Sequence, residues 1–155
     1  EAQTDLVRQL QARTVRRIYL ALAAGARKHE GTVNEPIGRH PSQRIKMAIV
    51  PENRGGKPAI TNIRILELFP YTTFVECSLE TGRTHQIRVH MAAIHHPLVG
   101  DQVYGKHNPK LPEFPRQALH ATRLGLVHPL TGLKVQWEVP MPEDMRDLLD
   151  SLRYG

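Results

Sequence analysis

The sequence contains a single cysteine, few aromatic residues and no long run of apolar residues. Because Cys77 is alone, no disulfide can form within the chain, which argues against a small disulfide-stabilised secreted domain and favours a cytoplasmic protein. A transmembrane helix needs roughly 18 consecutive apolar residues, and no run in the sequence is that long, so a membrane-spanning protein is excluded. The first residues lack the basic and then hydrophobic pattern of a signal peptide. With aromatic residues at 5%, a protein that holds nucleic acid mainly by rows of stacked rings is also disfavoured.

The positive charge of the chain is concentrated in its N-terminal part. The 155 residues suffice for one domain with a hydrophobic core, and their formal net charge is +6. Residues 1–60 contain 11 Lys and Arg against 5 Asp and Glu, whereas the two signs balance in the rest of the chain. A basic region on an otherwise balanced domain is typical of proteins that bind a phosphate backbone. Many basic proteins bind no nucleic acid, so charge alone makes RNA or DNA only the leading candidate partner.

Hydrophobic periodicity predicts an α+β fold with a mainly antiparallel sheet and flanking helices. Apolar residues recur at helical spacing in residues 2–13, 84–96 and from about 143 onward. Alternating apolar and polar residues predict strands at 15–24 and 46–50, one short strand around 31–37, and hairpins at 60–69 with 73–80 and at 119–127 with 133–139. The regular strand–helix–strand alternation of a parallel sheet is missing, and so are internal repeats, so we expect a single mixed domain.

One segment combines a tight turn, a predicted helix start and several basic side chains. Gly82 permits the turn after a strand, and a helix is expected from about Thr84. The first turn of a helix has unpaired N–H groups and favours anions, and Arg83 lies at that end. His85 and Arg88 are three residues apart and therefore share one helix face. The opposite, apolar face is formed by Ile87, Met91 and Ile94. On spacing alone, a solvated polar face is slightly favoured over a binding site.

The residues from Gly82 to His90 (GRTHQIRVH), followed by HPLVGD at 96–101, resemble the RluA-type family of RNA pseudouridine synthases. Further matching segments are RIYLA at 17–21, YG at 104–105, QALHA at 117–121 and HPLTG at 128–132. They follow the family's order and cover nearly the whole chain. The resemblance implies the fold of the pseudouridine synthase catalytic domain, isomerisation of uridine to pseudouridine in RNA, and no metal or other cofactor. It is strongest to the members that modify large-subunit ribosomal RNA, which makes that RNA the expected partner.

The resemblance implies catalytic roles for Tyr19 and Arg88. The reaction breaks the bond between uracil N1 and ribose C1′, rotates the base and rejoins it through C5, and the base must first be flipped out of its helix. Tyr19 matches the family's active-site tyrosine, whose ring would stack on the uracil and whose hydroxyl is a candidate for handling the C5 proton. Arg88 matches the basic residue that pairs with the nucleophilic aspartate. From the residues alone, a half-buried strand tyrosine is the commoner interpretation of Tyr19.

Five further residues are expected at the RNA. They are Arg17, Arg83, His85, Gln86 and Leu119. By position, Arg83 and His85 would face the RNA backbone or the flipped nucleotide, with Gln86 nearby. Leu119 matches an apolar pocket residue of the family, although from the sequence alone an ordinary core leucine is the favoured interpretation. Arg17 belongs to the basic N-terminal region and is a candidate for a backbone contact.

The family's nucleophile has no counterpart in this sequence. In the family it is an aspartate in a His-Arg-Leu-Asp segment just upstream of the helix predicted at 2–13. We therefore interpret residues 1–155 as the C-terminal major part of one catalytic domain, without the catalytic loop and without the S4-like RNA-binding domain of complete relatives. On this interpretation Arg88 lacks its acidic partner, which predicts a poorly ordered or solvent-filled pocket, and the 155 residues alone form no pseudouridine. Asp101 is expected to brace a loop, not to act as the nucleophile.

The sequence also bears on three other classes of protein: a metalloenzyme, a Ser or Cys hydrolase and a non-catalytic RNA-binding module. The nine histidines do not reproduce the spacing of a zinc-binding helix, so no metal site is expected. A Ser or Cys hydrolase is disfavoured because the Gly-x-Ser-x-Gly pattern is missing and Cys77 falls in an alternating strand. The serious alternative is a non-catalytic RNA-binding module that keeps the fold without its nucleophile. An aspartate following Arg-Leu upstream in the gene would favour the enzyme, and any other residue there would favour the binding module.

Overall fold

The computed structural model describes residues 16–43, 45–127 and 131–155. The strands are β1 (Arg16–Ala24), β2 (Gly31–Asn34), β3 (Ile37–Arg39), β4 (Met47–Ile49), β5 (Ile60–Leu68), β6 (Thr72–Leu79), β7 (Leu119–Val127) and β8 (Lys134–Glu138). The helices are the 3-10 turn η1 (Glu52–Arg54), α2 (Gln86–Ala93) and α3 (Glu143–Tyr154). The helix predicted at residues 2–13 and the turn at 128–130 lie outside the described residues.

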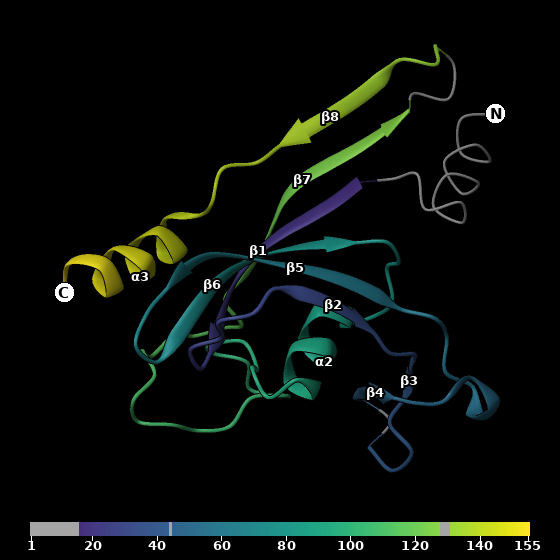
Figure 1. Ribbon diagram of the computed structural model, residues 1–155, viewed down its shortest axis with the longest axis horizontal. Coiled ribbons are helices and arrows are strands. Elements are labelled where there is room, and N and C mark those ends of the chain that lie inside the picture. Colours follow the sequence, from purple (N-terminus) through teal and green to yellow (C-terminus); the bar gives the residue numbers. More distant parts are fainter. Residues whose placement is uncertain (1–15, 44, 128–130) are drawn as a thin grey trace.

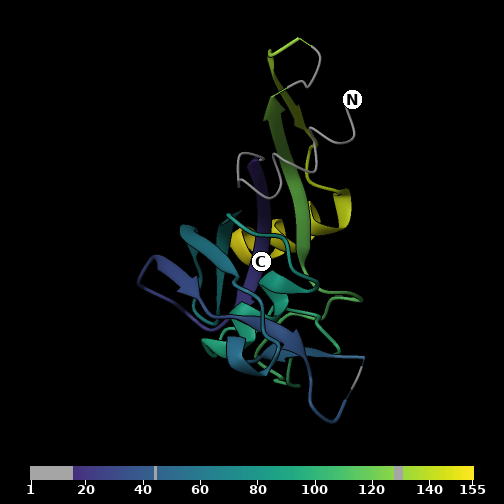
Figure 2. The ribbon, with the colours of Figure 1, turned by 90° about the vertical axis from the view of Figure 1, so that its right-hand side faces the viewer.

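The strands form one large sheet and one small one. The large sheet has the order β2-β5-β6-β1-β7-β8, and β3 pairs with β4 in the small sheet. Each strand pairing in the described residues is antiparallel, which confirms the predicted α+β class. Both views show the β7–β8 ribbon extending away from the end of the molecule where α2, β3 and β4 lie (Figures 1 and 2).

Strand β1 lies at the centre of the large sheet, and its alternating sequence places each side chain. Its hydrogen-bonded neighbours are β6 and β7. Because successive residues of a strand point to opposite faces, Tyr19 and Ala21 face one side and Leu20 and Leu22 the other, as predicted. Gly25 ends the strand with φ of 88°, a conformation that other residues rarely adopt.

Each face of the large sheet is covered by one of the helices, with a core cluster on each side, and a third, smaller cluster joins Ile37, Ala59 and Val89. The α2-side core contains Ala21, Ala23, Val33, Ile63, Val75, Cys77, Leu79, Ile87, Met91 and Leu98, with Tyr19 and Leu119 packed against it. The α3-side core contains Leu22, Phe69, Phe74, Val99, Ala118, Met145, Leu148 and Leu149. The predicted apolar faces of both helices are therefore buried, and Tyr19 lies on the same side of the sheet as α2.

The segment 31–37 differs from its predicted single strand. Two consecutive strands occur here: β2 pairs with β5 in the large sheet, and β3 pairs with β4 in the small sheet. Pro36 lies between them and has no amide hydrogen to continue a ladder. Its carbonyl oxygen accepts a hydrogen bond from Val50 N–H at 3.0 Å, which starts the pairing of the small sheet.

Candidate active site

The helix in the GRTHQIRVH segment is shorter than predicted. It runs from Gln86 to Ala93, not from residue 84 to residue 96. His85 has φ of 55°, in the left-handed region, so the residues before it cannot be part of the right-handed helix. The Gln86 N–H instead closes a turn onto the Arg83 carbonyl oxygen at 3.1 Å. At the other end His95, with φ of 69°, stops the helix in the same way.

Arg88 has an acidic partner, so the prediction of an unpaired guanidinium is wrong. Its Nε–H donates to Asp101 Oδ2 and its Nη2–H to Asp101 Oδ1, both at 2.9 Å. The two side chains are 11% and 0% exposed, so solvent screens this pair very little. Sequence reasoning missed the pairing because it considered only a carboxylate from outside the chain.

Asp101 also braces its own loop, as predicted. Its Oδ1 accepts hydrogen bonds from Val103 N–H at 3.0 Å and Tyr104 N–H at 3.1 Å. Burial alone would raise the pKa of Asp101, but the hydrogen bonds and charge of Arg88 and the two backbone donors outweigh it, so the pKa lies below its usual value. The hydrogen bond to Asp101 correspondingly raises the pKa of Arg88. Asp101 is therefore a fixed counter-ion for Arg88.

Tyr104 joins Arg88 to His85. The Arg88 Cζ lies 5.1 Å from the centre of the Tyr104 ring, in a cation–π arrangement. The Tyr104 hydroxyl is 2.7 Å from His85 Nδ1 and accepts the N–H of Met47 in β4 at 2.9 Å. His85 and Arg88 both contact Tyr104, but the prediction that they share one helix face is wrong, because His85 lies outside the helix.

Tyr19 lies in a second group of side chains, with Arg17 and Leu119. Tyr19 is half-buried on β1, and Leu119 packs with it against the α2-side core from the first position of β7. Among the described residues no hydrogen bond or ring contact joins Arg88 to Tyr19. The structure therefore places the two expected catalytic residues in separate clusters of contacts.

The guanidinium of Arg17 is packed against the turn before α2. A Cβ added at Gly82 would overlap Nη1 of Arg17. Burial lowers the pKa of Arg17, Tyr19 opposes this effect, and nearby Arg83 lowers it further. In the described part of the chain the buried Nε of Arg17 has no hydrogen-bond partner.

Arg83 and Gln86 are both bound to the protein itself. Arg83 Nε–H donates to the Pro58 carbonyl oxygen at 2.7 Å. Gln86 is 3% exposed, and its Oε1 accepts from the Thr81 hydroxyl and from Arg83 N–H. Its amide group donates to Ile60 O and to the Thr61 hydroxyl oxygen, both at 3.0 Å. With all four hydrogen-bonding positions used, Gln86 fastens α2 to β5, and this geometry does not favour the RNA contact expected from sequence.

His90 completes the attachment of α2. Its ring is fully buried, with Nδ1 2.8 Å from the Thr61 hydroxyl and Nε2 2.8 Å from the Glu35 carbonyl oxygen. A carbonyl can only accept, so the hydrogen is on Nε2 and the hydroxyl donates to Nδ1. Burial lowers the pKa of His90. Sequence analysis overlooked this role because Thr61 and Glu35 are far from His90 in the chain.

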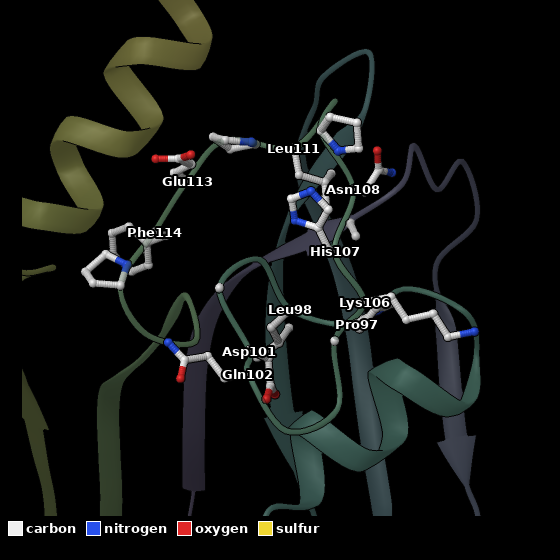
Figure 3. A pocket seen from close by; sticks show the side chains of 16 residues that line it. Pro97, Leu98, Asp101, Gln102, Lys106, His107, Asn108, Leu111, Glu113 and Phe114 are labelled. Carbon is white, nitrogen blue, oxygen red and sulfur yellow. The ribbon is translucent and has the colours of Figure 1, made fainter.

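A hollow of about 990 Å³ lies elsewhere, within the loop that follows α2 (Figure 3). Its walls come from residues between 97 and 115 together with Ala24, and Figure 3 shows Leu111 near His107 and Asn108 on one side and Phe114 near Glu113 on the other. Of the candidate site residues, Asp101 alone lines it. It is therefore not the uracil pocket expected around Tyr19.

The described residues contain neither a candidate metal centre nor a candidate membrane-spanning helix. In 16–43, 45–127 and 131–155, no three His, Cys, Asp or Glu side chains come together as metal ligands would. Within the same ranges no helix has the length and apolar character needed to cross a membrane.

Comparison with known proteins gives one consistent result. The model of the RNA pseudouridylate synthase family matches residues 1–93, which is more than half of the chain. The chain is 54% identical to ribosomal large subunit pseudouridine synthase D of Nitrosomonas europaea, covering 99% of this chain and 45% of that protein. It is 53% identical to the protein of the same name from Salmonella typhimurium, covering 98% and 49%. The chain thus spans about half the length of these curated relatives.

Two human structures have the same fold. Human RNA Pseudouridylate Synthase Domain Containing 1 aligns with a TM-score of 0.75 and 28% identity, over 96% of this chain and 70% of that one. Human RNA Pseudouridylate Synthase Domain Containing 4 aligns with a TM-score of 0.76 over 97% and 67%, and at 22% identity it supports the fold alone.

Proposed function

The chain belongs to the RNA pseudouridylate synthase family, and from this premise we propose that its protein converts uridine to pseudouridine in RNA. Large-subunit ribosomal RNA is the proposed substrate, because relatives more than 50% identical over nearly the whole chain are named for it. The observation that carries the proposal is the buried, aligned guanidinium of Arg88, because the reaction needs an ionised carboxylate and a cation to hold it.

The geometry of the ion pair leaves Arg88 able to bind a second carboxylate. Asp101 uses the Nε and Nη2 positions. An arginine has five N–H donors in a planar fork, so those of Nη1 remain for another anion. We propose that this anion is the nucleophilic aspartate of the family, supplied by the rest of the protein. Asp101 is then a positioning residue that fixes the plane of Arg88.

Tyr19 is the proposed contact of the flipped base. Its ring lies on the α2 side of the sheet, half-buried, with Leu119 packed against the same core. The aspartate would attack C1′ and displace the uracil at N1, and C5 of the rotated base would then attack C1′ and displace the aspartate. The C5 proton must leave and N1 must gain a proton, and the Tyr19 hydroxyl is proposed to handle the first of these. Arg17 beside it would bind a phosphate of the same nucleotide.

The test is Tyr19→Phe in the complete protein as its gene encodes it. Turnover is measured by release of tritium from RNA labelled at uridine C5, and RNA affinity is measured separately. Loss of a group that transfers a proton slows a reaction by about 10²–10⁴-fold, whereas RNA affinity should change less than about twofold because the ring remains. Tyr71→Phe is the matched control, since Tyr71 is an exposed tyrosine on a turn. Full turnover by Tyr19→Phe would refute the role of the hydroxyl.

One observation favours a second function, a non-catalytic RNA-binding module. Because Asp101 already neutralises Arg88, the fold needs no nucleophile to stabilise that buried charge. The two functions differ in whether the gene encodes the nucleophilic aspartate upstream and whether the protein forms pseudouridine. An aspartate after Arg-Leu upstream, together with pseudouridine in RNA treated with the complete protein, supports the enzyme. RNA binding without any pseudouridine supports the module.

A further inference from the structure

Resting on the proposed function, we propose that His85 is held as the neutral tautomer with its hydrogen on Nε2, and that this N–H binds a phosphate oxygen of the RNA. The proposal depends on the hydrogen-bond chain from β4 through Tyr104 to His85, and on the side of the imidazole that this chain leaves unused.

The backbone fixes where the imidazole lies. His85 has φ of 55°, a conformation uncommon for residues other than glycine and associated with functional sites. The next residue, Gln86, begins α2, and its side-chain amide nitrogen donates two hydrogen bonds to β5. The His85 side chain therefore leaves the chain at a rigid junction and meets Tyr104 edge-on, with ring centres 5.6 Å apart.

The hydrogen-bond chain determines the tautomer. The Tyr104 hydroxyl oxygen accepts the Met47 N–H at 2.9 Å. We assign its own hydrogen to His85 Nδ1, 2.7 Å away, because this is its one remaining hydrogen-bond partner among the described residues. An Nδ1 that accepts a hydrogen bond carries no hydrogen, so the neutral ring has its hydrogen on Nε2.

The surrounding charges keep the ring neutral. Burial lowers the pKa of His85, Arg88 lowers it further, Asp101 opposes them and Arg39 adds to the lowering. Protonation at Nδ1 would also place two donors against each other unless the Tyr104 hydroxyl turned away. At pH 7 His85 is therefore a neutral donor through Nε2.

An anion is the ligand that fits this donor. Within the described residues Nε2 of His85 has no hydrogen-bond partner, and His85 is partly exposed. Arg39, an exposed residue of β3, and Arg88, which also contacts Tyr104, are both close enough to lower the pKa of His85. A single N–H donor in a positive surrounding matches a phosphate oxygen better than a base, which is neutral.

A pair of variants separates the two ring nitrogens. In His85→Asn the amide reaches the Nδ1 position but not that of Nε2, and Asn tolerates positive φ well. In His85→Gln the longer amide places an N–H near the Nε2 position. We expect His85→Asn to keep the wild-type melting temperature and bind RNA about tenfold more weakly, the loss typical of one hydrogen bond to a charged group. His85→Gln should bind within about threefold of wild type. Equal weakening by both variants, or no weakening by His85→Asn, would overturn the proposal.

Salt dependence and nuclear magnetic resonance complete the test. Replacing a neutral donor leaves the slope of log affinity against log salt unchanged, whereas losing a cationic phosphate contact lowers it by about 0.7–0.9. We therefore expect an unchanged slope for His85→Asn, and a reduced slope would overturn the neutral donor. Nitrogen-15 shifts of His85 in the free protein report the tautomer directly, and an Nδ1–H or doubly protonated ring at pH 7 would also overturn it. These readouts need no turnover, so they stand apart from any failure to form pseudouridine.

Discussion

Asp101→Asn tests the buried ion pair with a minimal change of shape. The substitution keeps one oxygen and replaces the other by an NH₂ group of nearly the same size. That group would face Arg88 or the N–H groups of Val103 and Tyr104, all of which are donors. The Arg88 side chain is only 11% exposed, so water cannot replace the lost carboxylate. The variant therefore leaves a buried cation without its counter-ion.

The expected loss of stability is large. Removing one partner of a buried ion pair costs about 3–5 kcal/mol of unfolding free energy, because the remaining charge stays desolvated. For a domain of this size, about 2–4 °C of melting temperature corresponds to each kcal/mol, so we expect a decrease of about 6–20 °C. Because the folded pKa of Asp101 lies below its usual value, its stabilisation is complete above that usual value and is lost as pH falls through the folded pKa. The effect of the variant should therefore be constant from pH 8 to pH 5.

Asp144→Asn is the matched control. Asp144 also forms two hydrogen bonds with an arginine, Arg116, but their side chains are 45% and 38% exposed. Exposed pairs contribute about 0–1 kcal/mol. Unfolding by heat and by urea would be followed by circular dichroism for both variants in the complete protein. The reasoning is refuted if Asp101→Asn loses no more stability than Asp144→Asn.

Three further outcomes follow from the contacts of single residues. Gly82→Ala should displace the Arg17 guanidinium, weaken RNA binding several-fold and lower its salt slope by about 0.7–0.9, whereas Gly31→Ala, with open space around its Cβ, should leave both unchanged. Burial lowers the pKa of His90, so as pH falls the unfolded state takes up a proton before the folded state does. The free energy of unfolding should therefore decrease as pH drops below about 6.5 toward the folded pKa. Urea titrations at several pH values measure this, and His90→Gln should reduce the dependence of the unfolding free energy on pH. Burial raises the pKa of the Cys77 thiol to about 12, so iodoacetamide at pH 8 should label it only in denaturant, as mass spectrometry would show; rapid labelling of the folded protein would contradict its burial.

The elements of the large sheet could be predicted because their sequences carry a strong local signal. Strand β1 alternates large apolar residues such as Leu20 and Leu22 with Arg17, Tyr19 and small residues and stops at a glycine, and the β5–β6 hairpin alternates on both sides of Pro70. Helix α3 presents Met145, Leu148 and Leu149 on one face. In each case one face must be buried, so the period of the apolar residues determines the element.

The site was less predictable because its contacts join residues far apart in the chain. Asp101 is 13 residues from Arg88, and Tyr104 is 19 residues from His85. The left-handed conformation of His85 has no signal in the sequence, since helical spacing continues through it. A motif match could nominate Arg88 but could not show that a carboxylate of this chain already holds it.

The arrangement of the GRTHQIRVH segment bears on how its residues should be interpreted. Gln86 and His90 are buried; Gln86 is hydrogen-bonded to β5, and His90 to β5 and to the Glu35 carbonyl oxygen. Arg88 is aligned by Asp101, and His85 contacts Tyr104 through Nδ1 and leaves its Nε2 unused. Most of the motif therefore builds a rigid support, and a substitution there would lower activity mainly by lowering the folded fraction. Tyr19 lies outside that support, so loss of turnover with stability unchanged is the result that would separate a reacting group from the framework.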